Sequence, residues 1–135
     1  MSAYAVIFTL LNSDTTVTGL TNAQIFPDVA PQLFDRPQIV ITEISRVPNN
    51  TLGQQGESQL DVSRIQITTG STTRLLTEQI GEAVRSALDY INHTTIAGVW
   101  VDWISFENAN GFYDTSAGQD GLYMLHQDYK ISIRR

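Results

Sequence analysis

The sequence predicts an α+β fold: a two-layer sandwich in which a mainly antiparallel sheet of about four strands carries two helices on one face. The first observation is a helical period in residues 71–92, where apolar residues recur on one side of a helix. The second is the alternation of apolar and polar residues along 122–134, which is typical of a half-buried strand. The third is the order of elements, helix and strands twice over without a linker, which favours a single domain over residues 1–135.

The helix over residues 71–92 is the element around which the chain is expected to fold. Its apolar stripe includes Ile80, Val84 and Leu88, while charged side chains occupy the opposite side. Hydroxyl groups at residues 71–73 can accept hydrogen bonds from the first-turn amides. We expect the stripe to pack on a sheet that includes residues 99–106 and 122–134.

The segment before this helix contains the other expected helix and three strands. An apolar run over residues 3–11 predicts a first core helix that ends near Asn12, followed by a loose turn. Pro27, Pro31 and Pro37 follow a short edge strand expected at Ile25 and Phe26, and β-branched residues predict a strand over 38–47.

In two of the expected strands, it matters which face of the sheet each side chain points to. In residues 60–69, simple alternation points Leu60 and Val62 to one face and Ile65 and Ile67 to the other. This change of phase predicts a bulge near Ser63 and Arg64. Residues 99–106 hold two tryptophans, and simple alternation places one on each face of the strand.

Two long polar loops are expected, over residues 47–58 and 107–121. The first is longer than a hairpin requires and holds four amide side chains, so we expect it to contact a partner. A solvated loop without a partner is the alternative. The second loop carries aromatic residues that we expect to be exposed. The candidate partner-contact residues are Asn49, Asn50, Leu52, Gln54, Gln55, Phe112, Tyr113 and Asp114.

The composition limits the possible functions. The chain has 135 residues, a formal charge of −6, one lysine and no cysteine. A strongly acidic chain argues against a conventional nucleic-acid binder, which needs a basic surface to release counterions from phosphates. The absence of cysteine excludes disulfides and thiolate metal sites. The apolar run at the N-terminus is too short to span a membrane, and no membrane partner is expected.

No catalytic, cofactor-binding or metal-binding residues are predicted. The sequence lacks the glycine-rich phosphate loops and the nucleophile motif of hydrolases. His93 and His126 have no ligand neighbours at metal-binding spacing. The acidic residues of the long helix lie among arginines, which favours a solvated face over a pair of catalytic carboxylates. The protein is therefore not expected to be an enzyme.

Several motifs in order resemble one protein family. These are IFPDVAPQ at residues 25–32, RPQIVITEIS at 36–45, EAVRSALD at 82–89 and YDTSAGQDGLYMLHQDYKISIRR at 113–135. Together they resemble the tail completion, or tail terminator, family of long-tailed bacteriophages and phage-like particles. Gln38 departs from the aromatic residue expected there, and residues 47–58 match no family pattern.

The resemblance implies a structural virion protein with no cofactor. It would form a ring, usually a hexamer, at the head-proximal end of the tail tube, where it ends tube polymerisation and joins tail to head. The implied partners are copies of itself, the tail tube protein and a head-closure or neck protein. DNA would only pass through the lumen. The implied location is the tail or neck of the virion, after synthesis in the host cytoplasm.

Two other classes of function remain open from the sequence. One is another neck component, such as a head-closure or connector protein, which would share the small α+β size. The other is a small hydrolase that uses clustered carboxylates, for which dependence on a metal would be the test.

Overall fold

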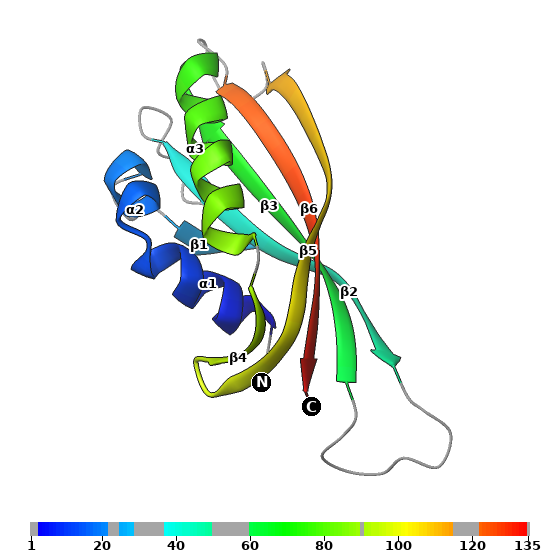
Figure 1. The fold of residues 1–135 in the computed structure, drawn as a ribbon. Coiled ribbons are helices and arrows are strands. Elements are labelled where there is room, and N and C mark those ends of the chain that lie inside the picture. The colour runs from blue at the N-terminus through cyan, green and yellow to red at the C-terminus, as the bar shows by residue number, and fades with distance from the viewer. Residues whose placement is uncertain are drawn as a thin grey trace, which may run out of the picture.

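The computed structural model describes residues 3–21, 25–28, 37–49, 60–89, 91–114 and 122–134 (Figure 1). Three helices and six strands make up this part of the chain. In order they are α1 (Ala3–Ser13), α2 (Thr15–Thr21), β1 (Ile25–Pro27), β2 (Gln38–Asn49), β3 (Leu60–Ser71), α3 (Arg74–Leu88), β4 (Asn92–Ile96), β5 (Val99–Asp114) and β6 (Leu122–Arg134).

The six strands form one mixed sheet in the order β1-β2-β3-β6-β5-β4. β1 runs parallel to β2, and the other neighbouring strands are antiparallel. The sheet is strongly twisted, so that its two ends face different directions in Figure 1. The predicted antiparallel sheet of about four strands with two helices is therefore wrong.

The elements that the prediction lacked are α2 and β4, both of which are short and polar. Four of the seven residues of α2 are threonines. The helix is capped by Asp14, whose Oδ1 accepts the N–H groups of Thr16 at 3.0 Å and Val17 at 3.1 Å. β4 begins with polar residues, because it lies at the sheet edge and is largely exposed. Neither element has the long apolar period on which the prediction depended.

The three helices lie together on one side of the sheet (Figure 1). α1 packs against β1, β2, β3 and β4, whereas α3 packs against β3 and β6. α2 contacts both other helices, and α1 and α3 also contact each other. The core between these layers contains many isoleucines from the sheet, among them Ile39, Ile41, Ile65, Ile67 and Ile131. We call the side of the sheet that faces away from the helices the open face.

The long helix is present as predicted, although it is shorter. Ile80, Val84 and Leu88 are fully buried, as the apolar stripe predicts. Thr73 is the N-cap, and its Oγ1 accepts the N–H of Leu76 at 3.3 Å. The helix ends at Leu88, earlier than the predicted end of the stretch.

The predicted bulge near Ser63 and Arg64 is wrong. The register shift lies in the neighbouring strand β2, between Glu43 and Ser45. β3 instead keeps one phase along its length, because Asp61 and Ser63 take buried positions in line with the isoleucines that follow. The sequence suggested a phase change because these two core-facing positions are polar.

β5 differs from the prediction in length and phase. It continues through residues 107–114, which were expected to belong to a loop. The register shifts between Val101 and Trp103, so Trp100 and Trp103 lie on the open face together. The prediction of one tryptophan on each face is therefore wrong.

In the described part of the chain, no helix is both long and apolar enough to cross a bilayer.

Candidate partner-contact surface

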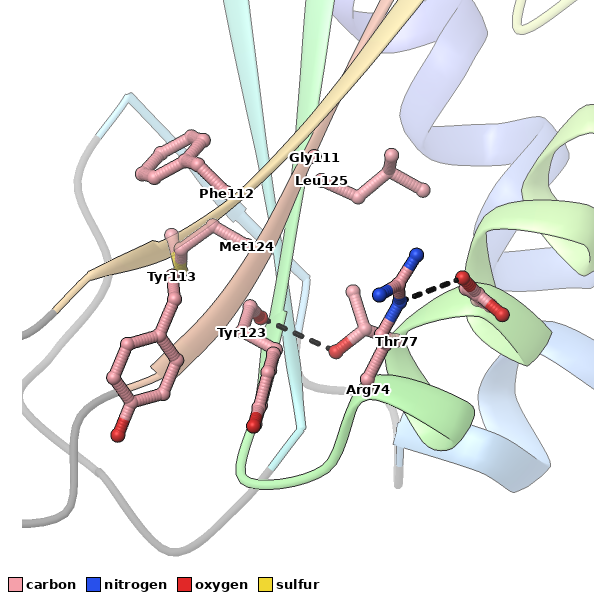
Figure 2. A pocket seen from close by; sticks show the side chains of 9 residues that line it. Arg74, Thr77, Gly111, Phe112, Tyr113, Tyr123, Met124 and Leu125 are labelled. Carbon is pink, nitrogen blue, oxygen red and sulfur yellow. Dashed lines mark hydrogen bonds and ion pairs between the residues drawn. The ribbon is translucent and has the colours of Figure 1, made fainter.

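The exposed aromatic residues of the sheet gather where β5 and β6 approach the N-terminus of α3 (Figure 2). Phe112 is 44% exposed and Tyr113 is 47% exposed. Because successive residues of a strand point to opposite faces, Phe112 lies on the open face and Tyr113 on the helix side. This end of the sheet therefore presents aromatic surface on both faces.

A cavity of about 380 Å³ lies at this end, between the first turns of α3 and the paired ends of β5 and β6. Its apolar lining comes mainly from the two strands, and its charged lining comes from α3 (Figure 2). The lining residues are Arg74, Thr77, Glu78, Gly111, Phe112, Tyr113, Tyr123, Met124 and Leu125. The cavity is an opening between one helix and two paired strands, and it exposes aromatic and methionine side chains to solvent.

Hydrogen bonds fix α3 against β6 at the floor of the cavity. Thr77 Oγ1 lies 3.2 Å from the carbonyl oxygen of Tyr123 and 2.9 Å from that of Thr73 (Figure 2). Ser71 Oγ is hydrogen-bonded to the same threonine hydroxyl. One turn further on, Gln127 Nε2 donates to the carbonyl oxygen of Gly81 at 3.0 Å. These bonds position the helix and strand rigidly on either side of the cavity.

Ring contacts hold the aromatic residues in place. The rings of Tyr113 and Tyr123 lie 4.7 Å apart between centroids, and those of Phe112 and His126 lie 4.9 Å apart. His126 is in turn fixed by Thr68, whose Oγ1 lies 2.8 Å from Nδ1 of the imidazole. The exposed rings thus have defined positions, which reduces the entropy that a partner would have to remove on binding.

A polar band crosses the open face next to the aromatic end. Arg64 is paired with Asp128 at 3.1 Å, and Gln66 Nε2 donates to the same carboxylate at 3.4 Å. Lys130 lies 3.7 Å from Glu107. Since most charges of this band are paired with each other, the open face presents mixed charge and hydrogen-bonding groups.

The structure gives no positive indication of catalysis. Across the described ranges, His, Asp and Glu side chains do not gather in threes where they could hold a metal ion. Two carboxylates of the α3 region are paired with arginines: Glu78 with Arg74 at 3.1 Å, and Asp89, which caps the helix, with Arg85 at 3.4 Å.

One buried polar group stands out in the core. The hydroxyl of Tyr129 is buried without a hydrogen-bond partner in the described structure. Burial raises the pKa of this hydroxyl, the charge of Asp89 raises it further, and Arg85 opposes the shift. The ring packs edge-on against Phe106, with centroids 5.4 Å apart. The group is enclosed by core side chains, so we assign it no binding role.

The structure brings together some of the predicted contact residues and leaves others unplaced. Phe112 and Tyr113 share the surface described above, and Asp114 is the last residue of β5. Asn49 is the last residue of β2, at the far end of the sheet. The remaining predicted residues, Asn50, Leu52, Gln54 and Gln55, lie outside the described residues. A role of any of them in binding stays a prediction.

Sequence reasoning missed the contribution of β6 to this surface. Tyr123 and Met124 lie opposite Tyr113 and Phe112 in the β5–β6 ladder. The alternation of 122–134 indicated a strand, but nothing in the sequence alone indicated which strand would pair with its start.

Residues 5–134 match the family model described as "Tail completion protein gp17". A comparison with curated protein sequences finds no match. Among solved structures, the fold is similar to a chain of the "Virion of native gene transfer agent (GTA) particle", with a TM-score of 0.73 and 11% sequence identity. That alignment covers 99% of this chain and 96% of the other, and at this identity it shows a shared fold.

The family match spans nearly the whole chain and agrees with the motifs found in the sequence. The chain belongs to the tail completion protein family and is a structural component of a phage-type virion tail.

Proposed function

We propose that six copies of this protein form a ring at the head-proximal end of the tail tube. The ring ends tube polymerisation and presents a surface to which the neck of the particle binds. The family match over residues 5–134 carries this proposal, because tail completion requires a component that acts at the end of the tube.

The aromatic end of the sheet is the surface best suited to a protein partner. Phe112 and Tyr113 are large, exposed and held in place by ring contacts, which are properties of residues that contribute most to protein interfaces. The neighbouring cavity can receive a side chain from the partner. We assign this surface to contact with the tube or the neck.

The charge of the chain suits a ring through which DNA passes. Each copy carries a formal charge of −6, so the ring as a whole repels the phosphate backbone. DNA is then cargo in the lumen and not a ligand.

A different neck component, such as a head-closure or connector protein, is the second candidate. It agrees equally well with the size and mixed fold of the chain. The two candidates differ in what the ring binds: a terminator binds the end of a tube built from tail tube protein, whereas a connector binds the head portal.

Negative-stain electron microscopy and native mass spectrometry of the purified protein test the ring. We expect particles of six copies, either free in solution or on tail tubes. A protein that stays monomeric at micromolar concentrations and in the presence of tubes would contradict the proposal.

The double variant Phe112→Ser/Tyr113→Ser tests the aromatic surface. We expect tube or neck binding to weaken by about tenfold or more, because exposed aromatic anchors dominate binding energy. Leu75→Ser is the matched control, since Leu75 is 67% exposed on α3 and does not line the cavity. If both variants bind as the parent does, this surface is not the contact.

A further inference from the structure

Among the described residues, each outer edge of the sheet is covered along only part of its length. β4 pairs with residues 99–103 of β5, and the last bond on that side is donated by the N–H of Ile104 to the carbonyl oxygen of Ile91 at 3.1 Å. Within the described ranges, no strand lies against the outer edge of β5 over residues 105–112.

The opposite edge has the same form. β1 pairs with residues 39–41 of β2, and the N–H of Asp28 donates to the carbonyl oxygen of Ile41 at 3.0 Å. Beyond that point, none of the strands that the structure describes covers the outer edge of β2 over residues 42–49. In the part of the chain that the structure describes, two stretches of similar length on opposite sides of one sheet therefore have no outer strand.

The register determines which N–H groups of β5 point outward. The N–H of Ile104 points away from β6, because it donates to Ile91. In an antiparallel pair, the direction of the backbone N–H groups alternates along each strand. Every second residue of β6, counted from Ile131, therefore faces a β5 residue whose N–H group also points away from β6. These β5 residues are Phe106, Ala109 and Gly111.

The same reasoning explains a proline in β2. The carbonyl of Ile41 points outward, away from β3. The β3 partners of Ile41 and Pro48 are Ile67 and Asp61, which are an even number of residues apart, so the backbone groups of Pro48 also point outward. A residue without an N–H group loses no bond to β3 there. The agreement supports the assignment of outward positions on both edges.

The two covered stretches lie at opposite ends of the sheet. One row of paired residues joins Asn92 of β4, Trp103, Ser132, Val62 and Val47 of β2. Another joins Phe26 of β1, Val40, Thr68, His126 and Asn110 of β5. Each edge is thus stepped: an outer strand protrudes at one end of the edge and is missing at the other. Because β4 and β1 protrude at opposite ends, the protruding strand of one edge matches the uncovered stretch of the other.

We propose that neighbouring copies join through these stepped edges, an inference that rests on the proposed ring. β1 of one copy lies antiparallel against residues 105–112 of the β5 of the next, and β4 of that next copy lies against residues 42–49 of the first copy's β2. The sheets of adjacent copies then form one continuous sheet. Contact between different patches of identical copies is heterologous, which is the geometry that a ring requires.

A second copy is the occupant that the edges fit best, because the step of each edge is filled by the strand that protrudes from the other. Residues 108–113 carry no charge, which allows copies of formal charge −6 to approach along this stretch. The joint also covers Val47, which is 59% exposed in one copy and lies in the row of Asn92.

Gly111→Pro is the first test. A Cβ atom at Gly111 would lie 3.7 Å from the carbonyl oxygen of Met124, so the position has room for a side chain. Proline removes an N–H group that points outward, and the ladder to β6 is kept. Gly111→Ala is the matched control, because it adds a Cβ and retains the N–H group.

We expect Gly111→Pro and Gly111→Ala to have the same circular dichroism spectrum. In native mass spectrometry, Gly111→Pro should need a protein concentration at least tenfold higher than Gly111→Ala to assemble. If Gly111→Pro assembles at the same concentration as Gly111→Ala, the edge contact is wrong and the ring proposal stands. If the parent itself does not assemble, the ring proposal fails and this inference fails with it.

Cross-linking keeps the inference testable if Gly111→Pro does not fold. The chain has no cysteine, so single-cysteine chains are specific probes. We expect Val47→Cys chains mixed with Asn92→Cys chains to form dimers with a short bismaleimide, because the two exposed side chains share one row across the joint. Val47→Cys mixed with Ser86→Cys on the exposed side of α3 should not. Equal yields in the two mixtures, or no cross-link in the first, would overturn the inference.

Discussion

The packing of α3 on the sheet can be tested with one substitution at two positions of the same helix. Leu88 is fully buried, whereas Leu75 is 67% exposed. Leu88→Ala removes a core side chain and leaves a cavity, which costs about 3 kcal/mol within a usual range of about 2 to 5 kcal/mol. Leu75→Ala removes a solvated side chain, so the free energy of unfolding should change by less than about 0.5 kcal/mol.

Urea unfolding followed by circular dichroism measures both changes. With an m-value of about 1.5 kcal/mol/M, Leu88→Ala should lower the urea midpoint by about 2 M. The measurement is made at a concentration at which the chain is monomeric, so that assembly does not add to stability. Equal losses for the two variants would contradict the burial of the stripe and the placement of α3 on β3 and β6.

Two further predictions concern single side chains in the fold. Tyr129→Phe should raise the free energy of unfolding by about 1 kcal/mol at neutral pH, because the buried hydroxyl has no partner in the described structure. The pKa of this hydroxyl is raised in the folded state, so the parent should lose about 1.4 kcal/mol per pH unit relative to Tyr129→Phe above pH 10, and parallel pH profiles would contradict this. Asp14→Ala should lower the free energy of unfolding by about 1 kcal/mol through loss of the α2 cap, whereas Asp14→Asn should retain most of it; equal thermal unfolding midpoints for parent and alanine variant would refute the cap.

The elements that could be predicted are those whose apolar residues repeat regularly within a single segment of the sequence. α3 could be predicted because its buried residues repeat at helical spacing over four turns, and β6 because it alternates along its whole length. β4 and the second half of β5 are polar, since they lie at the sheet edge and their stability comes from pairing with neighbours. Stabilisation by strand pairing does not require a regular pattern of apolar residues within the strand itself.

Bulges explain the errors in phase. One extra residue near Ile44 and another near Asp102 change which side chains face the core beyond them. A pattern read as simple alternation therefore placed the second tryptophan on the wrong face. The position of a bulge depends on the partner strand, so it cannot be obtained from one segment alone.

The candidate contact surface was only half predictable. Phe112 and Tyr113 were expected to be exposed, and they are. The cavity beside them was not expected, because its walls come from segments that are far apart in the sequence: Thr77 and Tyr123 are separated by 46 residues. The stepped edges likewise follow from strand order and register, which no local pattern specifies.

Electron microscopy of tail tubes incubated with the purified protein tests the central claim most directly. A tail completion ring should appear as a six-fold particle on one end of each tube and should stop the addition of further tube protein at that end. Particles on both ends, binding along the tube wall, or tubes that continue to grow at the occupied end would contradict the proposed function.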